Sequence, residues 1–145
     1  MLVKIKKIHQ DAVIPDYAHL SDAGCDLYSI EDVTIVDYAV IRLGLAIALP
    51  TGFELQIRSK SGLAAKNGLF VLNSPATIDA GYRGEIKVIL GNLSPTAYQV
   101  KKGQKIAQAI LSPVLQADFQ KVEILSQGER NHNGFGSTGL YRATD

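Results

Sequence analysis

Residues 53–58 read FELQIR, and this stretch decides the fold class. Its apolar residues alternate with polar ones, which is the period of a β-strand with one buried and one polar face. The same period of two recurs at the start of the chain, where Val3 and Ile5 alternate with lysines. Helical periodicity, with apolar residues three or four positions apart, is almost absent from the sequence. The pattern therefore predicts an all-β protein.

Further strands are predicted on both sides of this stretch, each bounded by turn residues. The turn signals include Pro50-Thr51-Gly52, Ser94-Pro95 and Lys102-Gly103. Many short strands with frequent turns favour an antiparallel jelly roll or distorted β-barrel, and we expect this fold. The additional predicted strands are 33–36, 40–49, 69–72, 85–92, 106–111 and 119–124.

One segment departs from the strand pattern. Residues 61–66, SGLAAK, offer Ser61 as an N-cap residue, good helix formers and a lysine in the last turn. Asn67-Gly68 follows, and glycine commonly ends a helix in the left-handed conformation. We expect one short helix here, between two strands.

The composition changes from Ser126 onwards. Residues 126–145 read SQGERNHNGFGSTGLYRATD, with four glycines and too few aliphatic residues for a strand. We expect a flexible, glycine-rich C-terminal arm over 126–145. Residues 1–125 then form the β domain, because 145 residues suffice for one hydrophobic core and not for two ordinary domains.

Composition and charge exclude several classes of function. Fifteen Lys and Arg against fourteen Asp and Glu give a net charge of +1, so we expect no nucleic-acid partner. No apolar run approaches the ~18 residues that a membrane span requires. The first eight residues, MLVKIKKI, lack the continuous apolar core of a signal peptide. The lone Cys25 suits a reducing compartment, and these features together predict a cytoplasmic protein.

Two segments are typical of anion-binding sites. Residues 134–139, GFGSTG, fit G-x-G-x-x-G, but the chain ends too soon for the helix and acidic residue of a dinucleotide-binding fold. Its backbone N–H groups could still wrap an anion, with Arg130 nearby; the alternative is a plain disordered tail. Lys60-Ser61-Gly62 places a cation, a hydroxyl and free amides at the start of the predicted helix; the alternative there is an ordinary N-cap.

A third segment, residues 74–84, carries a carboxylate in a turn-rich hairpin. Asp79 lies three residues before Tyr82, and such a hairpin can hold a planar base while Asp79 faces a neighbouring group. Alternatively, Asp79 caps a turn and Tyr82 belongs to the core. The same two alternatives apply to Asp26 in Gly24-Cys25-Asp26. The three histidines show no ligand spacing, so no structural zinc site is expected.

Taken in order, these segments resemble the five motifs of the trimeric dUTP diphosphatases, or dUTPases. The resemblance runs from about Ala23 to Gly139, most of the chain. Five motifs in this order, at fitting separations, make it specific. The matching segments are AGCDLYS at 23–29, RSKSGLA at 58–64, the run from Asn73 to Glu85, GQKIAQ at 103–108 and the run from Arg130 to Gly139.

The resemblance implies a homotrimer of jelly-roll subunits that hydrolyses dUTP to dUMP and pyrophosphate with Mg²⁺, each site being assembled from all three chains. It implies that Asp79 is the general base for a water that attacks the α-phosphorus, and that Asp26 positions the metal through water. Such an enzyme limits uracil incorporation into DNA and supplies dUMP for dTMP synthesis. The substrate-binding residues that it implies are Arg58, Lys60, Ser61, Gly62, Asn73, Thr77, Ile78, Tyr82, Gln108, Arg130, Phe135, Gly136, Ser137 and Thr138.

Roles within this set also follow from the resemblance. Asn73 and neighbouring main chain would bind uracil, Tyr82 would pack under the deoxyribose and exclude a 2′-hydroxyl, and Phe135 would stack on the base. The implied phosphate-binding roles are chemically consistent, because the charges of a triphosphate must be neutralised before water can attack. The implied phosphate ligands are Ser61, Gly62 and Gln108 from the β domain and Arg130, Ser137 and Thr138 from the closing arm.

Some positions depart from the family pattern. Lys60 and Lys105 stand where arginine is usual, and lysine keeps the charge without the bidentate fork. Gly81 replaces a common aspartate, which leaves Asp79 as the carboxylate of the loop. Asn131 and Asn133 take glycine positions, although asparagine tolerates positive φ better than most residues.

Two other functions compete with this interpretation. The dCTP deaminases share the fold but need a glutamate where this chain has Ile89, so deamination is not expected. A non-catalytic nucleotide-binding jelly roll is the second alternative. It would have no need of a base such as Asp79 beside the phosphates.

Overall fold

The computed structural model describes residues 1–137 and 139–141. The chain forms two compact units, Met1–Leu115 and Gln116–Asp145, which we call the body and the arm. The boundary predicted from composition lies at residue 125, whereas this division lies at Leu115. No helix in the described part of the chain is long and apolar enough to cross a membrane.

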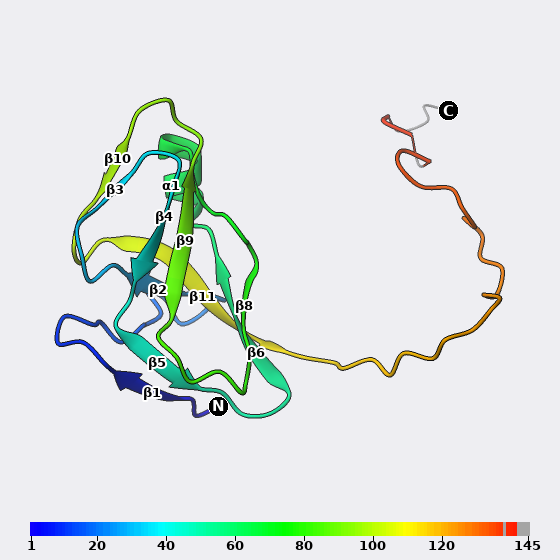
Figure 1. Ribbon diagram of the computed structural model, residues 1–145, viewed down its shortest axis with the longest axis horizontal. Coiled ribbons are helices and arrows are strands. Elements are labelled where there is room, and N and C mark those ends of the chain that lie inside the picture. The colour runs from blue at the N-terminus through cyan, green and yellow to red at the C-terminus, as the bar shows by residue number, and fades with distance from the viewer. Residues whose placement is uncertain (138, 142–145) are drawn as a thin grey trace. The chain divides into compact units, whose positions relative to one another are not determined.

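The body is an all-β jelly roll with a single short helix among its described residues, as predicted (Figure 1). All strand pairs are antiparallel and form a four-stranded sheet β2-β11-β6-β8, a three-stranded sheet β4-β9-β7, and the pairs β1-β5 and β10-β3. The elements are β1 (Lys4–Lys7), β2 (Cys25–Tyr28), β3 (Val33–Ile35), β4 (Tyr38–Arg42), β5 (Leu45–Ala48), β6 (Phe53–Arg58), α1 (Ser61–Asn67), β7 (Leu69–Val71), β8 (Ala76–Ile78), β9 (Lys87–Asn92), β10 (Tyr98–Val100) and β11 (Lys105–Pro113).

One hydrophobic core joins the two larger sheets. Leu27 of β2 and Ile57 of β6 contribute from the four-stranded sheet, and Val88 and Leu90 of β9 contribute from the three-stranded sheet. Each of these side chains is at most 1% exposed. Burying such a side chain stabilises the fold by about 1.5–3 kcal/mol. In β6, Leu55 and Ile57 are buried, as the alternation of apolar and polar residues predicts.

The predicted strand 40–49 is two strands in the structure. It is interrupted at Gly44, which has φ +65 and lies between β4 and β5. A Cβ atom at this position would lie 2.7 Å from Cβ of His9, so a side chain would meet both backbone strain and a steric clash. The break lets β4 pair with β9 while β5 pairs with β1.

The predicted strand 119–124 is wrong, because the described residues of the arm form no strand. The side chain of Phe119 is 92% exposed and that of Ile124 is 88% exposed. A lone strand leaves its backbone N–H and C=O groups without ladder partners, so an apolar alternation alone does not make one.

The helix prediction is confirmed, with a correction at its start. The N-cap residue is Lys60, with φ −86 and ψ 123, and not Ser61. The Lys60 side chain makes no capping hydrogen bond, because an ammonium group cannot accept one from a backbone N–H; it pairs with Asp26 instead. Gly68 ends the helix at φ 68, and its N–H donates to the Ala64 carbonyl.

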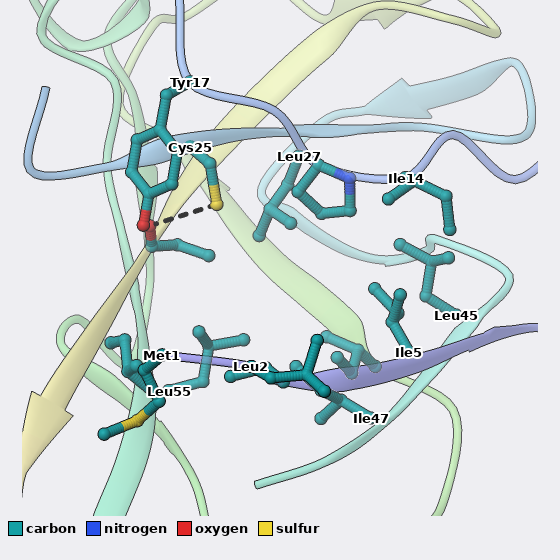
Figure 2. A pocket seen from close by; sticks show the side chains of 15 residues that line it. Met1, Leu2, Ile5, Ile14, Tyr17, Cys25, Leu27, Leu45, Ile47 and Leu55 are labelled. Atoms are coloured by element: carbon teal, nitrogen blue, oxygen red, sulfur yellow. Dashed lines mark hydrogen bonds between the residues drawn. The ribbon is translucent and has the colours of Figure 1, made fainter. Parts of the chain in front are cut away.

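An apolar cavity of about 330 Å³ lies beside β1 and β5 (Figure 2). Figure 2 shows Met1 and Leu2 on one side of it, with Tyr17 and Cys25 on the other. The Cys25 thiol donates to the Ala109 carbonyl at 3.5 Å, and burial raises the pKa of this thiol. The lining is almost wholly apolar, so this cavity offers little to a charged substrate.

Candidate active site

Three strands bring Asp26, Gln108 and Arg58 into one row across the four-stranded sheet. Gln108 of β11 lies opposite Asp26 of β2 on one side and opposite Arg58 of β6 on the other. Directly opposite residues of antiparallel strands share a face of the sheet. The row therefore gathers residues of the first, second and fourth predicted motifs.

Asp26 is buried and is shared by two lysines. Its Oδ1 accepts a hydrogen bond from Nζ of Lys60, and its Oδ2 lies 2.7 Å from Nζ of Lys105. Burial alone would raise the pKa of Asp26, but the bonds to Lys105 and Lys60 outweigh it and hold that pKa below its usual value. The hydrogen bond to Asp26 likewise raises the pKa of Lys105. The carboxylate is charged at neutral pH, and the three side chains together carry a net positive charge.

Gln108 is fixed by two neighbours from other motifs. Its Nε2 donates to the Ser59 carbonyl at 3.0 Å. A Cβ atom at Gly24 would lie 2.9 Å from Oε1 of Gln108, so only glycine permits this approach. Ser59 also accepts a hydrogen bond from the Val71 N–H at 2.8 Å, through Oγ. The motif segments thus support one another through packing and hydrogen bonds.

A hollow of about 390 Å³ opens beside this row. Helix α1 begins directly after Lys60, has no acidic residue in its first turn, and leaves Ser61 and Gly62 exposed. Ammonium groups and exposed backbone amides are the donors that bind phosphate oxygens. The hollow is lined by Ala18, His19, Asp22, Ala23, Gly24, Asp26, Lys60, Gln108 and Ile110.

Sequence reasoning missed His19 and Asp22 at the rim of the hollow. The two residues close a turn in which the His19 N–H donates to Oδ2 of Asp22 at 2.9 Å. No motif marks them, and the only sequence signal is their position just before AGCD. Sequence reasoning also left Lys105 out of the site, because the residue that a lysine contacts in the fold cannot be predicted from its neighbours in sequence.

Asp79 is exposed in the turn that follows β8. The predicted hairpin over residues 74–84 is wrong, because β8 pairs with β6 whereas the next strand, β9, belongs to the three-stranded sheet. The carbonyl of Asp79 accepts a hydrogen bond from the Tyr82 N–H at 3.0 Å, which closes the turn. Tyr82 is 44% exposed, so it does not belong to the core, and its hydroxyl donates to the Glu85 carbonyl at 3.0 Å. A Cβ atom at Gly84 would lie 2.6 Å from Cζ of Tyr82, so Gly84 leaves the space that this ring occupies.

The other predicted base-binding residues lie on β8 or in the turn before it. Asn73 is exposed in the turn between β7 and β8, Thr77 is exposed on β8, and Ile78 is half-buried. This segment, residues 73–84, is separated from the row described above. Ile78 lies opposite Leu55. Leu55 precedes Arg58 by three residues, a distance of about 10 Å along the strand. Within one chain, the structure groups Asp26, Lys60, Gln108 and Arg58 but leaves Asp79 apart.

The arm places two of its predicted phosphate ligands in contact. Nη2 of Arg130 donates to Oγ of Ser137 at 3.1 Å. Asn131 has φ 41, which confirms that asparagine accepts positive φ at this position. Phe135 is exposed, and Gly136 follows it with φ 104. Thr138 lies outside the described residues.

The donor set restricts how Mg²⁺ could bind. Both oxygens of Asp26 already pair with ammonium groups, and the described residues contain no group of three or more His, Cys, Asp or Glu side chains placed to hold a metal. Mg²⁺ commonly keeps several waters and takes its remaining oxygens from carboxylates and substrate phosphates. The site therefore fits an ion held mainly by phosphates and water.

A jelly roll with ammonium groups and exposed backbone amides beside a hollow points to the class of enzymes that act on phosphate-bearing substrates. The chain belongs to the dUTPase family, whose sequence model matches residues 10–139. The deoxyuridine 5′-triphosphate nucleotidohydrolase of Clostridium tetani is 51% identical over 139 residues, covering 94% of this chain and 96% of that protein. The enzyme of the same name from Nautilia profundicola is 53% identical over 141 residues, covering 96% and 99%.

Solved structures agree with this assignment. The Staphylococcus bacteriophage 80alpha dUTPase with dUpNHpp superposes with a TM-score of 0.85 at 28% identity, covering 96% of this chain and 99% of that chain. A dUTPase mutant from phage phi11 of S. aureus, described with a structural Mg(II) ion, shares the fold with a TM-score of 0.80 at 24% identity, covering 88% and 100%. The chain is a hydrolase of the dUTPase family with the family's fold.

Proposed function

We propose that this protein hydrolyses dUTP to dUMP and pyrophosphate, with a water activated by Asp79 attacking the α-phosphorus. The observation that carries the proposal is the hollow lined by Lys60, Gln108 and the buried Asp26, whose charge is balanced by Lys60 and, from outside the hollow, by Lys105. A polyphosphate needs such donors because its charges oppose the approach of a nucleophile. In the cell, this reaction would limit uracil incorporation into DNA and supply dUMP for dTMP synthesis in the cytoplasm.

The triphosphate would occupy the hollow. Lys60 and Arg58 contribute positive charge, and Ser61, Gly62 and Gln108 donate hydrogen bonds to phosphate oxygens. Mg²⁺, when bound, would neutralise part of the phosphate charge. Asp26 would orient that ion through water. These contacts bind and align the substrate without requiring a covalent intermediate.

Asp79 would accept the proton of the attacking water. Its exposed position in the turn after β8 suits this role, because a general base must reach the water from the side opposite the leaving group. The same segment, residues 73–84, would also bind the nucleoside, with Asn73, Thr77 and Ile78 around the uracil. Tyr82 would pack under the deoxyribose, where its ring leaves no space for a 2′-hydroxyl.

The arm would close over the bound nucleotide. Arg130 and Ser137 already contact each other, which would allow both to bind the γ-phosphate together with Thr138. Phe135, exposed in the arm, would stack on the base, and Gly136 would let the backbone approach the ligand. Closure excludes bulk water during the reaction, and opening releases the products.

We also propose a homotrimer that shares its active sites. Because Asp79 and the row around Asp26 are separated within one chain, Asp79 of one subunit would face the hollow of another, and a third subunit would supply the arm. Exposed apolar side chains around the start of the arm support an intermolecular contact. These side chains are Leu115, Phe119, Ile124 and Leu125.

The test is pyrophosphate release from dUTP, compared with dTTP, dCTP and UTP, with and without Mg²⁺. We expect release from dUTP alone and its loss in EDTA. Conversion of dCTP to a uracil nucleotide would instead support the deaminase alternative.

Substitution of the proposed base separates catalysis from binding. Asp79→Asn should retain affinity for a non-hydrolysable imido analogue of dUTP while kcat falls by a factor on the order of 10² or more. The matched control is Asp37→Asn, because Asp37 is also an exposed aspartate but lies outside residues 73–84. This variant should behave as wild type. Unchanged turnover in Asp79→Asn would refute the proposed base, and nucleotide binding without any turnover in the wild type would favour a non-catalytic function.

A further inference from the structure

The two lysines that pair with Asp26 approach it from different surroundings. Lys60 lines the hollow and directly precedes Ser61 and Gly62. Lys105 does not line the hollow; it reaches the other carboxylate oxygen from β11, and its ammonium lies 5.8 Å from the centre of the Tyr28 ring. One lysine therefore faces the space for a ligand, and the other lies outside that space with a second contact to the Tyr28 ring.

The burial of Asp26 makes this difference important. Its side chain is only 12% exposed, and a carboxylate in such a position is costly to leave without a cation. If the Lys60 ammonium moved to a phosphate, Asp26 would still have Lys105 as a partner. Without Lys105, the same movement would leave the Asp26 carboxylate buried with no cation beside it. Asp26 would therefore retain the Lys60 ammonium and compete with the ligand for it.

The chemistry of lysine favours such an exchange. Lys60 contacts Asp26 through a single nitrogen at the end of a flexible stem, and only one carboxylate oxygen is involved. An arginine can bind both oxygens of a carboxylate at once through its planar fork. The lysine at position 60 therefore has fewer bonds to break before it reaches an anion in the hollow.

We propose that Lys105 is a positioning residue for the polyphosphate site, which keeps Asp26 paired while Lys60 transfers its ammonium from Asp26 to a phosphate of the ligand. The inference deepens the proposed function and rests on a phosphate group occupying the hollow. Lys105 acts through Asp26 and Lys60 and does not itself contact the ligand.

The test compares Lys105→Met with Lys105→Arg in the full-length protein. Affinities for the imido analogue of dUTP and for inorganic tripolyphosphate are measured by calorimetry in EDTA, and KM and kcat for dUTP are measured with Mg²⁺. We expect Lys105→Met to weaken both ligands by about tenfold and to raise KM, with kcat changed less than about twofold. Lys105→Arg should restore binding because it can still pair with Asp26.

Two further variants separate positioning from structural damage. Lys101→Met removes a lysine of similar location whose exposed pair with Asp32, at 3.1 Å, lies outside the site, and it should bind both ligands as wild type does. In an Asp26→Asn background, Lys60 is no longer retained by a charge. Adding Lys105→Met to that background should therefore change metal-free affinity less than about twofold.

The outcomes distinguish this inference from the proposed function. Unchanged ligand affinity in Lys105→Met, or an equal loss in the wild-type and Asp26→Asn backgrounds, would overturn the role of Lys105. Absence of dUTP hydrolysis by the wild type would overturn the proposed function. In that case, a Lys105-dependent affinity for tripolyphosphate would still support the exchange of Lys60 between Asp26 and phosphate.

Discussion

Gly84 leaves room for the side chain that is proposed to recognise the sugar. The Tyr82 ring lies where a side chain at position 84 would project, and its hydroxyl is tied to the Glu85 carbonyl. Both residues are exposed, so their arrangement contributes little to the hydrophobic core. A change at Gly84 should therefore affect specificity more than stability.

Gly84→Ala is expected to displace Tyr82 and weaken the discrimination between dUTP and UTP. A misplacement of about 1 Å in a positioned group can reduce catalysis by a factor on the order of 10². We expect the ratio of kcat/KM for dUTP to that for UTP to fall by about 10-fold or more, with Tm nearly unchanged. The matched control is Gly81→Ala in the same connection between β8 and β9, where a Cβ atom would have no neighbour within 4 Å. An unaltered ratio in Gly84→Ala would contradict the role of Tyr82.

At the scale of single residues, the sequence predicts which side chains belong to the site better than it predicts which of them contact each other. Asp26, Lys60 and Gln108 could be proposed from their motifs, and the structure brings them together. The pairing of Lys105 with Asp26 could not be predicted from the sequence. It depends on the register between β2 and β11 and on a shift in that register between Lys105 and Ala107. A local pattern carries no information about such a long-range alignment.

At the scale of elements, the helix α1 depends on how it ends. Gly68 is left-handed, with φ 68, and a Cβ atom there would lie 3.3 Å from the backbone nitrogen of Ser94. An L-residue pays about 1–2 kcal/mol for this conformation, so glycine is the residue that fits. Because α1 begins at Ser61 in the second motif, its end also affects how that motif is held.

Gly68→Ala should lower Tm by about 2–8 °C, since the cost is about 1–2 kcal/mol and each kcal/mol shifts Tm by about 2–4 °C for a chain of this size. Thermal unfolding followed by circular dichroism measures the change. Gly52→Ala is the comparison, because Gly52 also has positive φ, +85, but a Cβ atom there would meet nothing within 4 Å. A smaller loss in Gly52→Ala would show the added cost of crowding at Gly68, while an unaltered Tm in Gly68→Ala would mean that the helix end relaxes.

The strands show where sequence patterns succeed and fail. FELQIR alternates clearly, and β6 spans the predicted residues 53–58. The short strands β8 (ATI) and β10 (YQV) are not predicted, although β3 and β7 are equally short and are predicted within 33–36 and 69–72. Residues 119–124, FQKVEI, show the opposite case, because their β-branched and aromatic residues favour a strand but they pair with no strand in the described chain. Pairing partners, and not propensity, decide these elements.

At the scale of the whole molecule, the sheet register separates the two halves of the proposed site. Asp26 lies on β2 at one edge of the four-stranded sheet, whereas Asp79 follows β8 at the other edge. Two strands, β11 and β6, lie between them. Motif order along the chain cannot reveal this separation. The family resemblance implies sites shared between subunits, and the separation within one chain supports that proposal.

The shared site predicts that two inactive variants complement each other. Asp26→Asn damages the hollow and Asp79→Asn removes the base, and each variant alone should show little pyrophosphate release from dUTP. Refolded together in equal amounts, random mixed trimers should recover about 25% of wild-type activity, because one site in four would combine an intact Asp79 with an intact Asp26 from another chain. The control mixes the two variants after separate folding, which should recover nothing until subunits exchange. If co-refolded variants stayed inactive while forming trimers, both halves of the site would have to come from the same chain, and the proposed exchange of residues between subunits would be wrong.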